Sequence, residues 1–389
     1  MIDGRLKELL DFLSDTLEPA RQAEIQDLYI RALNGEPVPR LPLIISHPIP
    51  AQARFQPYPH HEIFENPAKM LYNELVQAHA CSMSSRPELQ DDLLGAVRAN
   101  FGTVVIASIF GAHVEQVAEN PPWVRHLPGQ EIELDAILDR DPLDFTQGSC
   151  PRVVETCQFY QHVLGEYPAL RDLIRIILPD LQGPFDNLEL IVGSEMFVQL
   201  YTCPEKVQAA LHAMAMAQIG FARHLQPYLT DGPEGYTHQH AVMIKGQILV
   251  RADSVILVSP EMYGELIAPH DEYVLHELGG GGMHTCGRAD HHVDALLSLP
   301  SVRCLDFGQS ELNDMDSIYA AARNRGIPIV RVLASEEELV SGAIMDRYPT
   351  GVTVRHEATS LGAAQRIMKQ YVASTERRSI QREDSNEAK

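Results

Sequence analysis

The feature that most constrains the fold is an alternation of short apolar runs with amphipathic helical patterns in the second half of the chain. Strands that alternate with helices in this way are typical of a parallel sheet covered by helices. We therefore predict an α/β fold, whose last βα units are the most regular. The clearest strand candidates are GGGGMHTCG (279–287), SVRCLDFG (301–308), IPIVRVL (327–333) and GVTVRHE (351–357).

Earlier apolar runs bring the strand candidates to eight, the number that closes a (β/α)8 TIM barrel. They are TVVIASIF (103–110), LIRIILPDL (173–181) and a pair within AVMIKGQILVRADSVILVS (241–259). Before them, helical periodicity marks residues 4–34 and the segments NPAKMLYNELVQAHACSM and RPELQDDLLGAVRANF. We predict an N-terminal helical extension over residues 1–100, a barrel over 101–373 and a disordered polar tail over 374–389.

Composition narrows the classes of partner. Lys and Arg number 31 against 53 Asp and Glu, and the net charge of -22 disfavours binding to nucleic acid or to an anionic membrane surface. The N-terminal segment lacks a basic region followed by a continuous apolar run, so we expect a cytoplasmic protein. Six cysteines in 389 residues are too sparse for a disulfide scaffold, which indicates reduced thiols. An oligomer is compatible with the sequence.

His284 and Cys286 form the most specific candidate site. They stand two residues apart at the end of a predicted strand, so both side chains project from the same face. In a barrel this end faces the active mouth, and imidazole and thiolate are standard zinc ligands. We predict one zinc ion, with His356 or Glu357 at the end of the last predicted strand as a third ligand. The alternative is that Cys286 packs as a small apolar residue and His284 only forms hydrogen bonds.

Other polar residues near strand ends give less specific signals. Asp306 ends the next predicted strand, and it is either a fourth ligand, an acceptor that orients His284, or a turn cap. His238 and His240 lie on one side of an extended segment, where they face the pocket or belong to a solvated loop. We predict catalytic roles for these three residues. His113, after the first predicted strand, is a candidate for substrate binding.

Two longer stretches carry a resemblance to a known superfamily. ADSVILVSPEMYGELIAPHDEYVLHELGGGGMHTCGRADHHVDALLSLPSVRCLDFG resembles the uroporphyrinogen decarboxylase-like superfamily, through the helix start Ser259-Pro260-Glu261 and the strand end His284-x-Cys286-Gly287. It is most similar to the branch of zinc enzymes that move a methyl group from a corrinoid protein to a thiol. YPALRDLIRIILPDLQGPFDNLELIVGSEMF resembles the same branch, in which this strand end lines the substrate pocket. This implies substrate-binding roles for Asp180, Gln182 and Asp186.

The resemblance implies a zinc-dependent methyltransferase with a methylcobalamin donor, a small-molecule thiol acceptor and a corrinoid carrier protein as partner. One departure is that the branch has a second cysteine at its last strand, whereas this chain has none after Cys304 and places His356 about there.

Two alternatives follow from the same resemblance. One is a uroporphyrinogen decarboxylase-type lyase, in which cationic side chains grip a tetrapyrrole; the candidates are Arg152, Arg175, Arg251 and Arg288. The arginine-rich motif of that branch is absent from residues 35–60, which disfavours it. The other is a non-catalytic barrel that captures a corrinoid or a metal.

Overall fold

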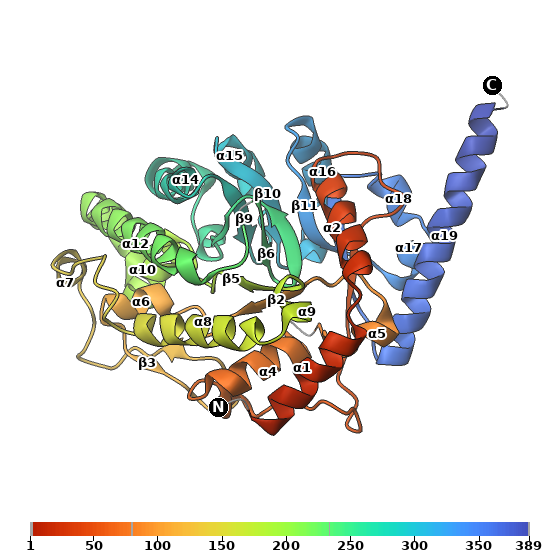
Figure 1. Cartoon of the computed structure of the whole chain (residues 1–389). Helices are drawn as coiled ribbons and strands as arrows, with labels where there is room; N and C mark the ends of the chain where they lie inside the picture. Colours follow the sequence, from red (N-terminus) through yellow and green to blue (C-terminus); the bar gives the residue numbers. More distant parts are fainter. Residues whose placement is uncertain (1–2, 79–80, 233, 388–389) are drawn as a thin grey trace.

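A computed structural model describes residues 3–78, 81–232 and 234–387. Its centre is a six-stranded parallel sheet enclosed by helices (Figure 1). The strand order is β1 (Leu43–Ser46), β12 (Val352–Glu357), β11 (Ile329–Leu333), β10 (Val302–Phe307), β9 (Gly281–Thr285) and β8 (Ile248–Arg251). The mixed α/β architecture predicted from the sequence is confirmed, and its last βα units lie where they were expected.

Two further parallel strands form a separate pair, β2 (Gly95–Arg98) and β5 (Ile174–Ile177). Among the described residues no strand ladder joins this pair to the six-stranded sheet, so closure into a barrel stays a prediction. The remaining ladders are antiparallel: β3 (Val114–Glu115) with β4 (Trp123–Val124), and the hairpin of β6 (Tyr236–Gln239) with β7 (Val242–Lys245).

Helices connect the strands and cover the sheet. Local signals start several of them: the Asn66 side chain caps α4 by accepting from the N–H groups of Ala68 and Lys69, and Ser335 forms a capping box with Glu338 at α17. Across the described residues, none of the helices combines the length and the apolar character needed to span a membrane.

The helices are α1 (Gly4–Thr16), α2 (Pro19–Leu33), α3 (His60–Ile63), α4 (Pro67–Gln77), α5 (Arg86–Leu89), α6 (Val105–Ile109), α7 (Leu134–Leu138), α8 (Cys150–Gly165), α9 (Pro168–Arg171), α10 (Pro184–Val192), α11 (Glu195–Thr202), α12 (Pro204–Leu225), α13 (Pro260–Met262), α14 (Ala268–Glu277), α15 (Val293–Ser298), α16 (Met315–Asn324), α17 (Glu336–Ser341), α18 (Ile344–Arg347) and α19 (Leu361–Glu387).

The N-terminal hundred residues are more than a helical extension, because they supply strands β1 and β2. Strand β1 has only four residues, too few for a clear period-two signal, and it pairs with β12. The helix expected over RPELQDDLLGAVRANF ends at Leu89, since the side chains of Asp91 and Asp92 bond to backbone N–H groups of β1. Gly95 then lets β2 approach β5, because a Cβ atom at position 95 would lie only 2.3 Å from the backbone oxygen of Leu173.

Two other expectations also differ from the structure. The run 103–110, predicted as a strand, forms the short helix α6, and all five of its residues are buried. Thr103 and Ser108 are the polar positions of this run, too few to reveal its period, so pattern alone could not separate the two structures. The last helix continues past residue 373 to Glu387, and Figure 1 shows it projecting at the edge of the molecule. Residues 79–80 of the helix predicted over NPAKMLYNELVQAHACSM lie outside the described residues, as do residues 388–389 of the predicted tail.

Candidate metal centre

Neighbouring parallel strands bring the candidate residues to one edge of the sheet. His284 lies near the end of β9, and in the strand register it is paired with Asp306 of β10 on one side and Arg251 of β8 on the other. Cys286 follows β9 directly, and Asp253 follows β8. Because carboxyl ends of parallel strands meet at the same edge, residues far apart in sequence come together there.

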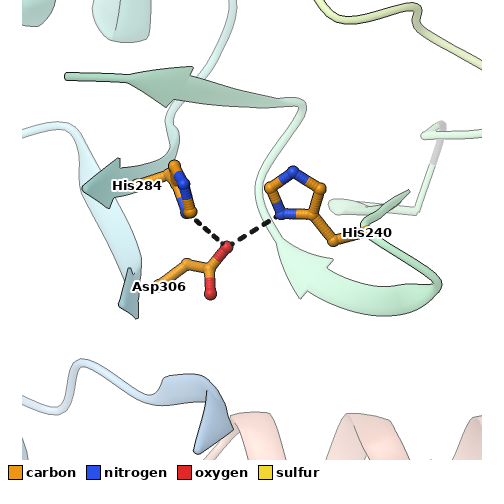
Figure 2. A group of neighbouring side chains, drawn as sticks. All are labelled: His240, His284 and Asp306. Carbon is orange, nitrogen blue, oxygen red and sulfur yellow. Dashed lines mark hydrogen bonds and ion pairs between the residues drawn. The ribbon is translucent and has the colours of Figure 1, made fainter. Parts of the chain in front are cut away.

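The two ring nitrogens of His284 have different partners. Its Nδ1 lies 2.8 Å from Oδ2 of Asp306 (Figure 2), and its Nε2 lies 3.4 Å both from Sγ of Cys286 and from Oδ1 of Asp253. Burial alone would raise the pKa of Asp306, but the Arg331 charge and the imidazoles hold it well below its ordinary value, so this carboxylate can only accept. Nδ1 therefore donates, and the lone pair of Nε2 faces Cys286 and Asp253.

Asp253, His284 and Cys286 together offer a carboxylate oxygen, an imidazole nitrogen and a sulfur within 4.8 Å of one another. These are the donor types that zinc takes, and three protein ligands leave the fourth tetrahedral position for a substrate, as in catalytic zinc sites. The carboxylate that orients His284 from behind is also typical of zinc-bound histidine. The residues therefore fit a zinc ion.

The electrostatics of the site also fit a cation. Burial, and then the charge of Asp253 and a hydrogen bond to it, raise the pKa of the Cys286 thiol to about 12. Burial and the charge of Asp253 raise the pKa of Asp186 to about 7. A cation at these ligands would favour the thiolate and offset the repulsion between the two carboxylates.

A second trio of donors, His240, His284 and Asp306, also lies within 4.8 Å (Figure 2). Here the Asp306 carboxylate already bonds to the Arg331 guanidinium, through Nε at 3.1 Å and Nη2 at 2.7 Å. A fixed positive charge on the same oxygens disfavours a metal ion between them. We therefore interpret this trio as the hydrogen-bonded support of the first one.

His240 reaches Asp306 from the tip of the β6–β7 hairpin. It and Ala241 form the two-residue turn, and both have positive φ, 48° and 66°, which corresponds to the tight turn favoured by hairpins but is costly without glycine. The Nδ1 atom of His240 lies 3.0 Å from Oδ2 of Asp306. Burial, together with the charges of Arg331 and Arg251, keeps the pKa of His240 well below its ordinary value, so the ring is neutral.

The structure places the other predicted residues in different surroundings. His356 joins neither trio; its Nδ1 lies 2.8 Å from the backbone oxygen of Ala334, and it lines a separate cavity together with Glu357. The Nδ1 atom of His238 lies 2.8 Å from Oδ1 of Asp231, and His113 is exposed to solvent.

The three residues implied by the resemblance are buried and have defined partners. Asp180 forms a buried ion pair with Arg251 at 2.7 Å, and the backbone oxygen of Gln182 accepts from Gln218. The Asp186 carboxylate accepts from the backbone N–H groups of Asp253 and Ser254, at 2.8 and 2.9 Å.

Sequence reasoning missed Asp253 and Arg331. Asp253 carried a usable signal, because it lies two residues after β8, within the segment 241–259 predicted to hold a pair of strands, and carboxylates at the strand ends of a parallel sheet lie near one another. Arg331 carried none: it lies inside a strand, and its direction depends on an irregular register between Ile329 and Val332 and on a φ of 60°.

Asp186 is expected to control metal affinity without touching the metal. In Asp186→Ala the loop that holds Asp253 loses two hydrogen bonds, so we expect zinc affinity to fall about 10- to 100-fold, as for other residues that orient a ligand. Competition with a chromophoric chelator measures this. Asp186→Asn keeps one acceptor and should fall between Asp186→Ala and the wild type. Equal affinities in all three proteins would contradict the role.

Comparisons with known proteins identify a shared fold. No protein-family model matches the chain, and no curated protein matches its sequence. Among solved structures the chain is similar to a methyltransferase from Methanosarcina mazei, with a TM-score of 0.57 and 14% sequence identity. The match covers 91% of this chain and 98% of the methyltransferase chain. At this identity the likeness shows that the two chains have the same overall fold.

Proposed function

We propose that the protein is a zinc-dependent methyltransferase that moves a methyl group from a corrinoid donor, such as methylcobalamin on a carrier protein, to a small thiol. The observation that carries this proposal is the convergence of Asp253, His284 and Cys286 at one strand edge, with His284 held by Asp306. Membership of the uroporphyrinogen decarboxylase-like superfamily, barrel closure and a cytoplasmic location belong to the same proposal. The fold shared with a methyltransferase supports it.

Each residue has a defined task in this mechanism. When bound, Zn²⁺ supplies a Lewis acid that lowers the pKa of a thiol near it. Asp306 fixes the tautomer of His284, so that Nε2 is a ligand atom, and Arg331 keeps Asp306 ionised. Asp186 holds the loop of Asp253 in place. Asp253, His284 and Cys286 would hold the ion, and the acceptor thiol would be activated beside them.

The proposed reaction balances without an external oxidant or reductant. The cobalt–carbon bond breaks with its electron pair on cobalt, which leaves Co(I), and the methyl carbon forms a bond to the thiolate sulfur. The thiol proton is released to solvent. The chain's task is to hold the thiolate and exclude other nucleophiles, which is catalysis by positioning and by charge stabilisation.

The test combines metal analysis with a transfer assay. Protein purified without chelator is incubated with methylcobalamin and a panel of small thiols, and thioether formation is followed by mass spectrometry and cobalamin by its visible spectrum. We expect one zinc ion per chain and turnover that Cys286→Ser abolishes. Cys203→Ser is the matched control, because Cys203 is also half-buried but joins neither donor trio. Zinc-free protein with full turnover, or equal turnover in both variants, would contradict the proposal.

The decarboxylase alternative gains no support from the four arginines proposed for it, Arg152, Arg175, Arg251 and Arg288. Its candidate arginines bond to different parts of the molecule: Arg251 to Asp180, Arg288 to Asp290, Arg175 to the backbone of Thr230 and Arg152 to Glu65. The non-catalytic alternative would be supported by tight cobalamin binding without turnover in the same assay.

A further inference from the structure

A large polar cavity lies between helix α4, the end of strand β2 and the segment 57–63. Its volume is about 820 Å³, within the range of small-molecule sites. None of the three candidate zinc ligands lines it. Its wall combines an apolar part, formed by Tyr58 and three prolines, with the polar side chains of Arg98, Glu74 and His60; the prolines are Pro57, Pro59 and Pro121.

Arg98 has a guanidinium without a hydrogen-bond acceptor. It is the last residue of β2, and its side chain is 12% exposed. Its Nε and Nη1 atoms are buried, and neither donates to any residue that the structure describes. The nearest carboxylate oxygen, Oε2 of Glu74, lies 3.9 Å from Nε, beyond hydrogen-bond distance. Among the described residues only this ion pair balances the guanidinium, and its buried donors without hydrogen-bond partners indicate an acceptor that enters the cavity from outside.

Glu74 is a weak counter-charge for this arginine. Its oxygens accept from the side-chain amide of Asn100 at 2.9 Å and from the backbone N–H of Arg98 at 3.3 Å. Burial raises the pKa of Glu74 above its ordinary value, so its negative charge is less favoured than that of an exposed glutamate. His60 adds a further polar atom to the cavity wall, because its Nδ1 is buried without a partner among the described residues.

We infer that this cavity binds a small organic carboxylate, whose two oxygens accept from the guanidinium of Arg98. A guanidinium presents two parallel N–H donors in a plane, which matches the two oxygens of a carboxylate. The Nδ1–H tautomer of His60 supplies another donor to the ligand, and Tyr58 with the prolines contacts its carbon skeleton. The inference rests on Arg98 and its cavity, and it does not depend on methyl transfer at the zinc ligands.

Calorimetric titration of the full-length protein tests this site with acetate, benzoate, succinate, citrate and inorganic phosphate. We expect saturable binding of at least one carboxylate. Arg98→Met should weaken that binding about 10- to 100-fold, the value of a charged hydrogen bond. Arg98→Lys keeps the charge but loses the paired donors, so it should also weaken binding. Arg366→Met is the control, since Arg366 is exposed and paired with Glu336.

Two further measurements make the result decisive. Binding should persist in His284→Ala, which separates this site from a carboxylate bound to zinc. The thermal unfolding midpoint of Arg98→Met reports how far the buried Glu74 carboxyl depends on the guanidinium 3.9 Å away; if that variant fails to fold, Arg98→Lys, which keeps a charge there, still tests the site. The inference is overturned if no carboxylate binds, if only phosphate binds, if Arg98→Met and Arg98→Lys bind as the wild type does, or if binding disappears in His284→Ala.

Discussion

Removal of the Asp253 carboxylate is expected to weaken zinc binding more than about 100-fold, whereas removal of the His356 imidazole should leave it unchanged. Asp253 lies 3.4 Å from the His284 nitrogen that faces the site, while His356 bonds to a backbone oxygen and joins neither donor trio. Changes to residues that only orient a ligand already cost 10- to 100-fold, so loss of a ligand should cost at least as much. Chelator competition on Asp253→Ala and His356→Ala gives both affinities.

This pair of variants also decides between two ligand sets. The sequence predicted His284 and Cys286 with His356 or Glu357, and His356 stands about where the zinc enzymes that the sequence resembles have a distal cysteine. The structure brings Asp253 to the other two residues instead. Asp253→Asn is a matched control for size, because its amide oxygen is a poorer zinc ligand than a carboxylate. If His356→Ala loses zinc and Asp253→Ala keeps it, the ligand set predicted from the sequence is the better one.

Much of the fold could be predicted because its strands carry strong local signals. Strands β9 to β12 are apolar runs separated by amphipathic helices, and they form adjacent members of one sheet. Strand β1 and helix α6 could not be predicted in the same way. The first is short and follows a proline-rich segment, and the second has a single polar residue, Ser108, so neither shows the period of its structure.

Part of the candidate site could be predicted from the sequence, and part could not. His284 and Cys286 lie on one strand, so their proximity follows from a spacing of two. The third donor depends on which strand is the neighbour: β8 lies beside β9, whereas β12 is separated from β9 by β10 and β11. The sequence drew attention to His356 and not to Asp253, because only the spatial order of the strands brings Asp253 beside His284.

The other large effect is expected at Arg331, which no local pattern distinguishes. Arg331→Met should lower the free energy of unfolding by about 3–5 kcal/mol, because it leaves the Asp306 carboxylate buried without its cationic partner. Asp306 is 1% exposed, and the guanidinium supplies two of its hydrogen bonds, at 2.7 and 3.1 Å. Urea unfolding followed by circular dichroism measures the change. Arg331→Lys restores a charge without the paired donors and should recover part of it.

A double-mutant cycle separates the ion pair from the packing of the arginine stem. Asp306→Asn removes the buried negative charge, so Arg331→Met should cost much less in that background than in the wild type. Arg347→Met is the surface control; Arg347 pairs with Asp316 and Glu338, but its side chain is 37% exposed, and its loss should cost no more than about 1 kcal/mol. Equal costs of Arg331→Met in both backgrounds would show that Arg331 contributes through packing alone. In that case the support of His284 would come from Asp306 and His240 without the guanidinium, and zinc affinity should be the same in Arg331→Met as in the wild type.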